Sequence, residues 1–523
     1  MRLFRTVAGL RCYLELHRAG QTVGLVPTMG ALHVGHLSLI QQARRENEIA
    51  IVSIFVNPLQ FGPTEDFEKY PRSLEGDRQR CEEAGVDAIF VPSAEEMGVA
   101  GESSEHCVQV VPPESMTSVL CGRSRIGHFQ GVTTIVAKLF NTIWPDRAYF
   151  GKKDAQQLAI IRQMVADLKW PVEIVACPIV RESSGLAMSS RNQYLSESEK
   201  ERASVLYRSL QKAAKKFSAG DATNRGIIAA VKSELATVPE VKLEYCTLVD
   251  PTTLRPLETV ERAGLLAIAA QVGQTRLIDN IILKNRQPIV AIDGPAGAGK
   301  STVARLVAKE LGLMYLDTGA MYRALTWQVL EWGISLDDEP AIAEVASTAK
   351  IELADPEDEG TPTRVLINGH DVTQAIRSSI VTAHVSDISS YKSVRRHLVC
   401  LQQKFGERGG VVVEGRDIGT HVFPDAELKI FLTASVGERA RRRQKDLTNR
   451  GEQEIPLEQL ATQIEQRDRK DSTRKIAPLT KAKTAIEIET DGRTVDEVVR
   501  EIVKHYRQRG LGNEYHSLGN DKR

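Results

Sequence analysis

Residues 289–302 read IVAIDGPAGAGKST, a short apolar run that leads into a glycine-rich loop. The apolar run predicts a buried strand, and residues 303–312 after the loop have helical periodicity. The loop has the spacing GxxxxGKS/T, which binds phosphate when it lies between a strand and a helix. This stretch therefore predicts an α/β nucleotide-binding fold.

The loop is expected to bind a triphosphate through its backbone. Glycines let N–H groups turn inward around phosphate oxygens, and the N-terminus of the helix adds partial positive charge. Lys300 would neutralise the β- and γ-phosphates, and Ser301 would ligate Mg²⁺. The expected ATP-binding residues of this loop are Gly294, Pro295, Ala296, Gly297, Ala298, Gly299, Lys300, Ser301 and Thr302.

A second motif, PTMGALHVGH at residues 27–36, stands where another predicted strand ends. Gly30 and Gly35 allow close approach to the backbone, and His33 and His36 share one face if a helix starts here. Two imidazole donors and a helix dipole can stabilise charge that develops on phosphate oxygens. Two alternatives stay open: a zinc pair, for which HxxH without a third ligand is a poor signature, and ordinary capping or core histidines.

Length and composition bound the class of protein. At 523 residues the chain is long enough for more than one domain, and 42% hydrophobic residues allow large cores. The 68 basic and 68 acidic residues balance to a formal net charge of 0, which argues against whole-chain binding to nucleic acid or a membrane surface. One basic run, RARRRQK, lies between Glu438 and Asp446 and leaves a local nucleic-acid patch or a localisation signal as an alternative.

The cysteines and the N-terminal residues indicate in which cellular compartment the protein is expected. Seven cysteines, an odd number without any CxxC, argue against a disulfide framework or a structural zinc site and favour a reducing cytoplasm. Residues 1–20 have arginines within their apolar part and predict an amphipathic helix rather than a signal peptide. No apolar run approaches roughly 18 residues without a charge, so no membrane span is expected.

Short apolar runs alternate with helical patterns in the first half of the chain. Helical periodicity is clear at 36–47 and at 132–143. Alternating strands and helices predict a mostly parallel, Rossmann-like sheet. The expected strands span 22–27, 49–56, 87–92, 147–151 and 172–180.

The pattern changes after Ser196, which begins a plausible capping box with Glu199. A long helix is expected to follow. Strand-like runs at 241–250, 264–272 and 275–283 then complete a smaller α+β subdomain.

We expect two domains, 1–283 and 289–523, joined by a linker KNRQP at 284–288. Five extended residues reach at most about 17 Å, so the two domains should lie close together. The first domain would consist of a nucleotide-binding region, residues 1–195, and the small subdomain, residues 196–283.

The second domain has further strand signals and one polar insert. Apolar runs at 410–417 and 427–435 predict buried strands. A turn-rich, polar stretch at 354–373, with one strand signal RVLING, is expected to belong to a small insert within about 340–390. The polar tail GLGNEYHSLGNDKR is expected to fray.

Five later segments have residues suited to a phosphoryl acceptor and its phosphates. They are LDTGAMYR at 316–323, SDISSYKSVR at 386–395, VEGRDIGTHVFPDA at 413–426, GERARRRQKD at 437–446 and QRDRKDSTRKIAPL at 466–479. Arginines recur in them, and phosphoryl transfer needs cations around the migrating group. On these motifs, the chain from 287 to about 508 resembles cytidylate kinase.

This resemblance implies a P-loop nucleoside-monophosphate kinase domain that phosphorylates CMP or dCMP with ATP. A lid at about 450–480 would contain Arg467, Asp471 and Arg474, and its arginines would close over the γ-phosphate and exclude water. The choice of cytosine rests on the resemblance, so UMP or AMP stays open as the acceptor. The residues assigned to CMP are Thr318, Arg323, Ser386, Arg395, Arg416 and Asp417.

In the first half, three segments accompany the histidine motif: FVNPLQF at 55–61, GKKDAQQ at 151–157 and GLAMSSRNQYL at 185–195. Each lies near the end of a predicted strand, and parallel sheets bind ligands at the carboxyl ends of their strands. With these motifs, residues 1 to about 283 resemble pantothenate synthetase, also called pantoate–β-alanine ligase. The resemblance implies condensation of pantoate with β-alanine through pantoyl adenylate, with ATP cleaved to AMP and pyrophosphate.

The resemblance also assigns roles. His36 would be the acid-type catalytic residue, with His33 beside it on the phosphates, and Lys153 and Arg191 would offset phosphate charge. Gln60 and Gln157 would hold pantoate, because amides hydrogen-bond hydroxyls and carboxylates without adding charge. The ATP site would comprise Met29, Gly30, Ala31, Leu32, His33, Val34, Gly35, His36, Gly151, Lys152, Lys153, Asp154, Val180, Met188, Ser189, Ser190 and Arg191.

The expected whole is therefore an α/β chain with a Rossmann-like nucleotidyl-transferase domain and its small α+β subdomain, fused to a P-loop kinase. Both sites would use ATP and Mg²⁺ on small-molecule substrates, without nucleic acid or membrane as partner. The resemblance suggests a homodimer formed through the first domain. A rival hypothesis is that one site binds nucleotide without turnover and regulates the other.

Overall fold

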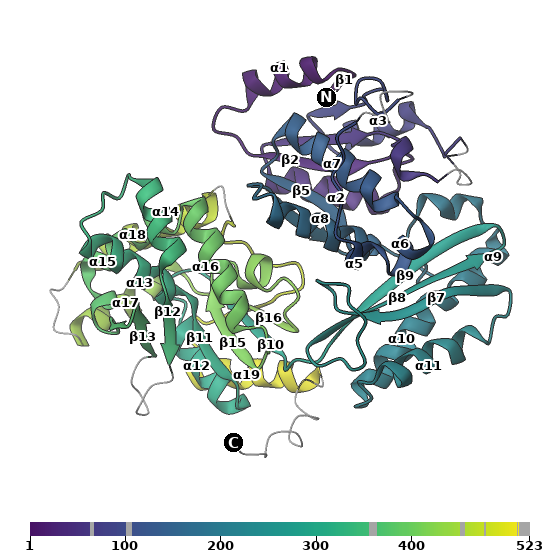
Figure 1. Ribbon diagram of the computed structural model, residues 1–523. Coiled ribbons are helices and arrows are strands. Elements are labelled where there is room, and N and C mark those ends of the chain that lie inside the picture. Colours follow the sequence, from purple (N-terminus) through teal and green to yellow (C-terminus); the bar gives the residue numbers. More distant parts are fainter. Residues whose placement is uncertain are drawn as a thin grey trace. The chain divides into compact units, whose positions relative to one another are not determined.

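The computed structural model describes residues 1–62, 67–68, 70–100, 107–354, 363–449, 455–474, 477–509 and 511 (Figure 1). It divides into two compact units, Met1–Asn285 and Arg286–Arg523. The division falls inside the stretch 284–288 that the sequence predicts as a linker. Among the residues so described, no helix is long and apolar enough to cross a membrane.

A six-stranded parallel sheet forms the centre of the first unit, with the strand order β1-β4-β3-β2-β5-β6. Every residue of Ile49–Ile54 is buried, as expected of a β-branched run covered on both faces. The predicted parallel sheet is confirmed. Its strands are β1 (Arg2–Phe4), β2 (Val23–Thr28), β3 (Ile49–Ile54), β4 (Ala88–Phe90), β5 (Arg147–Gly151) and β6 (Glu173–Cys177).

The first residues correct the prediction of a helix at the N-terminus. Arg2–Phe4 form the edge strand β1, paired with β4, and the amphipathic helix α1 (Val7–His17) begins only after Thr6. The Thr6 hydroxyl accepts a hydrogen bond from Gly9 N and caps this helix. Residues 2–4 are a strand because they pair with a strand more than eighty residues away, which no local pattern reports.

Helices cover both faces of this sheet (Figure 1). Leu25 packs in a core cluster with side chains of α1, α7 and α8, such as Phe140. Its neighbour Val26 packs in a second cluster with side chains of α2 and α3, such as Ile40. Successive strand residues point to opposite faces, so both layers are needed to bury them. The helices are α2 (Val34–Glu46), α3 (Leu74–Glu83), α5 (Glu114–Thr117), α6 (Leu120–Ser124), α7 (His128–Ile143) and α8 (Ala155–Asp167).

The small subdomain packs helices against an antiparallel sheet of β7 (Val241–Val249), β8 (Ala263–Val272) and β9 (Thr275–Lys284). The predicted capping box of Ser196 and Glu199 is present. The single long helix expected after it is wrong, because the helical run divides at Ser204, whose backbone N–H is shared between Lys200 O and Glu201 O, each at 3.2 Å. The helices are α9 (Glu197–Ala203), α10 (Val205–Ser218) and α11 (Asn224–Leu235).

The second unit is built on a parallel sheet with the strand order β11-β15-β10-β16-β17. The three strands predicted here are confirmed as β10, β15 and β16. Residues of α12 and α19 pack together on one face of this sheet. The elements are β10 (Ile289–Asp293), α12 (Lys300–Leu311), β11 (Met314–Asp317), β15 (Val411–Gly415), β16 (Leu428–Thr433), β17 (Ile486–Glu489) and α19 (Val495–Gln508).

The segments expected to form the insert and the lid contain helices, and the small sheet belongs to the insert alone. The predicted strand RVLING is β13, and it pairs antiparallel with β12 and β14. Residues 355–362 of the insert, residues 450–454 and 475–476 of the lid, and the tail after 511 lie outside the described residues. The elements are α13 (Thr318–Glu331), α14 (Glu339–Thr348), β12 (Ile351–Ala354), β13 (Arg364–Ile367), β14 (His370–Asp371), α15 (Ser379–Ile388), α16 (Lys392–Phe405), α17 (Val436–Asn449) and α18 (Leu457–Thr473).

The junction between the units has little free chain on either side. Asn285 N donates to Arg262 O at 2.7 Å, which fixes it to the first unit. The Arg286 guanidinium contacts the carboxylates of Asp425 and Glu427 at 3.2 and 3.1 Å, which fixes it to the second unit. The residues expected to form a linker are thus each bound to the unit beside them.

Candidate active sites

A cavity of about 250 Å³ opens at the carboxyl edge of the six-stranded sheet. It brings together the histidine motif after β2, the segment after β3, the loop after β5 and the segment after β6. The expected site residues that line it are Met29, His33, Gly35, His36, Gln60, Gly151, Lys153, Asp154, Gln157, Val180, Met188, Ser189, Ser190 and Arg191.

Other residues expected at the ATP site lie beside or behind this lining. Leu32 is buried in the core between α2 and the sheet, whereas the Val34 side chain is 60% exposed. Gly30 and Ala31 form the turn before the histidines, with φ of 83° and 49°. Lys152 is the first residue of the short 3-10 helix η2 (Lys152–Asp154) that contains Lys153.

His33 and His36 form the start of α2, and each uses the same ring nitrogen to do so. His33 Nδ1 accepts from Gly35 N at 3.1 Å, and His36 Nδ1 accepts from His33 N at 3.4 Å. In a neutral imidazole whose Nδ1 accepts, the proton is on Nε2. The two rings lie 4.0 Å apart, centre to centre, beside the cavity. The histidines therefore do cap a helix, and capping leaves each with an Nε2–H donor.

Both imidazoles are neutral at pH 7. Burial, reinforced by the charge of Lys153, lowers the pKa of His33 to about 4. Burial, with further contributions from His33 and Lys153, lowers the pKa of His36 to about 3. The site therefore presents hydrogen-bond donors without two added full charges.

The loop with Lys153 is held by the small subdomain. Asn280 Nδ2 on β9 donates to Lys152 O at 3.0 Å and to Lys153 O at 2.9 Å. The neighbouring Asp279 forms a two-point ion pair with Arg181, at 2.6 and 2.9 Å, just before the segment with Met188 to Arg191. Sequence reasoning missed both residues, although an adjacent Asp and Asn inside an apolar strand was an available signal.

Gln60 is buried and held in place. Its Oε1 accepts from Asn57 Nδ2 at 3.0 Å, and its carbonyl oxygen accepts from His128 Nδ1 at 2.7 Å. Asn57 Nδ2 also donates to Gly131 O at 3.0 Å, which ties this segment to α7. Asn57 and His128 are further residues of the site that the sequence alone did not single out.

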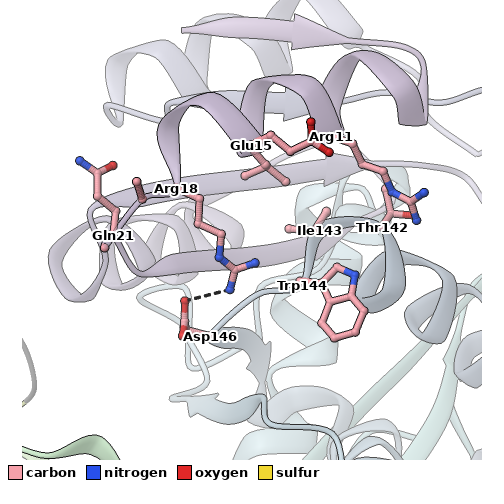
Figure 2. A pocket seen from close by; sticks show the side chains of 11 residues that line it. Arg11, Glu15, Arg18, Gln21, Thr142, Ile143, Trp144 and Asp146 are labelled. Carbon is pink, nitrogen blue, oxygen red and sulfur yellow. Dashed lines mark ion pairs between the residues drawn. The ribbon is translucent and has the colours of Figure 1, made fainter.

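A larger hollow, of about 790 Å³, lies at the other end of the sheet (Figure 2). It lies beside the C-terminal ends of α1 and α7 and the residues just before β2 and β5. Figure 2 shows Trp144 beside the Arg18–Asp146 ion pair of 3.5 Å, and the Trp144 side chain is 58% exposed. Parallel sheets bind ligands at the carboxyl ends of their strands, which favours the cavity of His33 and His36 over this open hollow as the candidate nucleotide site.

In the second unit, the glycine-rich loop joins β10 to α12 as predicted. Gly294 has φ of 149°, and a Cβ there would meet Leu432 O at 2.1 Å, so only glycine fits. Lys300 lies at the start of α12, buried, and its Nζ donates to Pro295 O at 2.8 Å. Burial and the nearby charge of Arg416 lower the pKa of Lys300. Its side chain thus lies over the loop, where a triphosphate would meet it.

Paired arginines and aspartates surround this loop. Arg416 Nε donates to Asp471 Oδ2 at 3.0 Å, and Arg416 Nη1 donates to Gly294 O at 3.2 Å. Asp417 is paired with Arg395 and lies 3.5 Å from Arg474 Nη2. The end of β15, α16 and the lid helix α18 therefore meet at one site, as the sequence predicted for the arginine-rich segments.

The remaining expected acceptor residues lie on neighbouring elements. Thr318 Oγ1 donates to Glu414 O at 2.7 Å, and Arg323 pairs with Asp317 at 2.8 Å. Ser386 lies on α15, next to Asp387. Arg467 lies on the lid helix α18, where burial and the charge of Arg416 lower its pKa. Several cations thus converge here, which favours the binding of anions.

The basic run RARRRQK is on α17, and three of its arginines, Arg439, Arg441 and Arg442, form ion pairs within the unit. Arg439 pairs with Asp468 at 2.6 Å and donates to Ala296 O in the phosphate loop at 3.2 Å. Arg442 pairs with Glu438 at 3.0 Å. Sequence reasoning considered this run as a nucleic-acid patch, whereas the fold uses Arg439 to connect the lid helix with the phosphate loop.

The fold and the two sites define the class: two ATP-using α/β units in one chain, one with a histidine motif and one with a P-loop. The family model of pantoate–β-alanine ligase matches residues 2–282, and that of cytidylate kinase matches residues 290–508. The chain belongs to these two families, one in each half. It thus joins a pantoate–β-alanine ligase and a cytidylate kinase in one polypeptide.

Two similar proteins are named for both activities. A bifunctional pantoate ligase/cytidylate kinase of Trichormus variabilis is 59% identical over 530 residues, 97% of this chain and 99% of the relative. One of Synechocystis is 55% identical over 515 residues, 98% of this chain and all of the relative. The crystal structure of pantothenate synthetase from Thermus thermophilus is 46% identical, with a TM-score of 0.51, and covers 54% of this chain and 99% of its own.

Proposed function

We propose that the ligase unit works through an acyl adenylate formed in the cavity of His33 and His36. The pantoate carboxylate attacks the α-phosphorus of ATP, and pyrophosphate leaves. The β-alanine amine then attacks the carbonyl of pantoyl adenylate, so that pantothenate forms and AMP leaves. Gln60 and Gln157 would hold pantoate by neutral hydrogen bonds.

The observation that supports this most is the state of the two histidines. Both are neutral and have Nε2–H beside the cavity, so each can donate to an α-phosphate oxygen that gains negative charge during attack. The low pKa of His36 favours hydrogen-bond donation over proton transfer as its role. Lys153 and Arg191 in the lining would offset the remaining phosphate charge.

For the kinase unit, we propose that the γ-phosphoryl group of ATP passes to the phosphate of CMP or dCMP. Lys300 and the phosphate loop would bind ATP, and Arg416, Arg467 and Arg474 would surround the migrating group. The acceptor would be held by Thr318, Arg323, Ser386, Arg395 and Asp417. The convergence of these arginines next to the loop supports this assignment.

Oxygen ligands suited to Mg²⁺ stand at the same place. Ser301 follows Lys300 at the start of α12, and its hydroxyl interacts with the buried carboxylate of Glu414. A hydroxyl and a carboxylate are ligands that this hard cation prefers, so we propose that these two residues hold it together with the nucleotide. Bound Mg²⁺ would neutralise charge on the β- and γ-phosphates.

We also propose that the chain dimerises through the ligase unit. Val108, Val111 and Ile126 are large aliphatic side chains left exposed. The segment with Val108 and Val111 is held on α7, since Val110 N donates to Thr134 Oγ1 at 3.0 Å. A second copy of the chain would cover these side chains. Sedimentation should give a dimer for the native chain and a monomer for V108D/V111D, and a native monomer would refute the proposal.

We also propose that the protein is located in the cytoplasm. All seven cysteines are free thiols, and Cys12 and Cys400 are exposed. Exposed unpaired thiols suit a reducing compartment, which is also where ATP and CMP are abundant.

Product analysis of two variants tests the proposed roles. In the full chain, His36→Ala should lower AMP formation from pantoate, β-alanine and ATP by about 10²- to 10³-fold, the loss typical of one donor to a developing oxyanion. Lys300→Ala should lower ADP formation with CMP by at least as much and leave the ligase unchanged. Loss of both activities in either variant would contradict two independent sites.

The same assays separate the alternative functions. Nucleotide binding in the wild-type chain with neither AMP nor ADP as product would favour a regulatory module. A panel of CMP, dCMP, UMP and AMP decides the acceptor of the kinase, and faster turnover of UMP or AMP would contradict the choice of cytosine.

A further inference from the structure

A buried carboxylate lies behind the turn that leads into the histidine motif. Asp77 on α3 has a side chain that is 1% exposed. Its Oδ2 accepts from Ala31 N at 2.8 Å, and its Oδ1 accepts from Leu32 N at 2.7 Å. Both carboxylate oxygens are therefore used by two successive backbone N–H groups of one turn.

That turn has an unfavourable backbone conformation. Gly30 and Ala31 both have positive φ, 83° and 49°, and for alanine this left-handed region is costly. A backbone of this kind persists only where its surroundings hold it. Asp77 supplies two charge-assisted hydrogen bonds at this place, and such bonds are about twice as strong as neutral ones.

Besides these two hydrogen bonds, the carboxylate has the partial positive charge of the first turn of α3, in which it lies, and one distant cation. The Arg80 guanidinium is 3.9 Å away, and 47% of that side chain is exposed. A buried anion is unfavourable unless it is hydrogen-bonded. Asp77 is thus bound mainly to the two N–H groups of the turn. These hydrogen bonds fix the turn and α3 to each other.

The turn leads directly into the residues proposed to meet the phosphates. Leu32 N is bound to Asp77, and the next residue, His33, is the N-cap of α2 and accepts from Gly35 N. A change in the backbone at 31–32 would therefore move the His33 ring and the first turn of α2, which includes His36. The carboxylate itself does not line the cavity.

We propose that Asp77 is a positioning residue of the adenylation step. It fixes the left-handed turn at Gly30 and Ala31, so that the Nε2–H groups of His33 and His36 face the α-phosphate. In the second step, β-alanine attacks the adenylate. No triphosphate is then present, so this step does not need the two histidine donors to face one. This inference rests on the proposed role of the two histidines.

The test compares the two half-reactions in the full chain. Adenylation is measured as pantoate-dependent exchange of pyrophosphate into ATP, and the second step as pantothenate formed from supplied pantoyl adenylate and β-alanine. The variants are Asp77→Asn, in which the amide keeps one acceptor oxygen but turns an N–H₂ toward the other N–H, and Asp77→Ala. The kinase rate of the same chain measures the amount of protein.

The matched control is Asp87→Asn. Asp87 Oδ2 also accepts from a backbone amide, Ala50 N, at 2.8 Å, and it pairs with Arg44 at 3.3 Å. It lies just before β4, at the amino end of the sheet and away from the cavity. Its loss should cost some stability and leave both half-reactions unchanged.

We expect the Asp77 variants to raise KM for ATP and to slow the pyrophosphate exchange by about 10- to 100-fold. A loss of this size is typical when catalytic groups, here the two histidines, are misplaced by about 1 Å. The rate of the second step should change little. Equal loss in both half-reactions with unchanged KM for ATP would show a merely structural role and overturn the proposal, as would full exchange activity. If the Asp77→Ala variant does not fold, the rates of the two half-reactions and KM for ATP are compared for Asp77→Asn alone. Wild-type chain without exchange would instead refute adenylation itself.

Discussion

The two nucleotide sites differ in how they present charge. In the ligase unit, the motif proposed to meet the phosphates has two imidazoles that burial keeps neutral. In the kinase unit, the loop is surrounded by full charges in pairs, Arg416 with Asp471 and Arg395 with Asp417. Attack at the α-phosphate and transfer of the γ-phosphate place the developing charge differently, so each site has its own arrangement of donors.

The same two sites share one structural device. Asp77 accepts from two successive amides, Ala31 N and Leu32 N. In the kinase unit, Asp293 accepts from Ile418 N and Gly419 N, both at 2.7 Å, just after Arg416 and Asp417. In each case a buried carboxylate fixes the backbone next to residues of the site. Positioning of the backbone by a buried carboxylate is thus common to both sites, whereas the arrangement of charged side chains differs between them.

Removal of a full charge from the kinase site should have the largest effect. Arg416→Ala leaves the buried Asp471 without its nearest guanidinium and removes a proposed phosphate contact. We expect kinase kcat/KM to fall by about 10²- to 10³-fold, with Arg416→Lys intermediate because lysine lacks the planar fork. Steady-state assays with CMP measure this, and the ligase rate of the same chain should stay constant.

A matched ion pair away from the site provides the control for that variant. Arg364 and Asp371 pair at 2.8 Å on the β13–β14 hairpin, with both side chains nearly half exposed. Arg364→Ala should change kinase kcat/KM by less than about twofold, since exposed pairs contribute little. Equal losses in Arg416→Ala and Arg364→Ala would mean that Arg416 acts through stability alone.

A neutral contact in the ligase unit should have a smaller effect. Asn280→Ala removes the two hydrogen bonds to Lys152 O and Lys153 O, which we expect to lower ligase kcat/KM by about tenfold, or ~1.4 kcal/mol. Asn224→Ala is the control, because Asn224 Nδ2 donates to Leu257 O at 2.6 Å elsewhere in the small subdomain. If both variants retain full ligase activity, β9 does not position the Lys153 loop.

The smallest expected effect is a difference between the two units in how their stability changes with pH. The pKa values of His33 and His36 are about 4 and 3 in the folded chain, below the ordinary 6.5. The unfolded chain therefore binds more protons below pH 6.5, and the ligase unit should lose stability as pH falls from 6.5 towards 4. Per histidine the loss is at most about 1.4 kcal/mol for each pH unit.

Asp293 predicts the opposite trend for the kinase unit. Burial raises its pKa to about 6, above the ordinary 3.8, so its favourable protonated state is lost as pH rises through 6. Calorimetry of the full chain between pH 7 and 5, with the kinase transition identified by its shift with CMP, measures both trends. His36→Gln should flatten the ligase trend and Asp293→Asn the kinase trend, and parallel trends in both units would contradict these pKa shifts.

Sequence patterns predicted the elements that depend on local chemistry. The run of β-branched residues at Ile49–Ile54 and the capping box at Ser196 are formed as expected. The edge strand at Arg2–Phe4 and the break at Ser204 were not predicted. The first needs a distant partner strand, and the second is a change in the backbone hydrogen bonds of one turn. The spacing of apolar residues shows the periodicity of a helix or strand, but it does not show which strands pair.

The sequence by itself determined the two motifs proposed to bind phosphate, because glycines, a lysine and histidines at fixed spacing act through the backbone that contains them. Only the tertiary structure decided which distant residues support them. Asp77, Asp279 and Asn280 lie far along the chain from the segments that they hold. An Asp and an Asn inside an apolar strand stand out in the sequence, but the sequence does not say which loop they contact. The neutrality of His36 was also decided there, because burial is a property of the packed fold rather than of the motif.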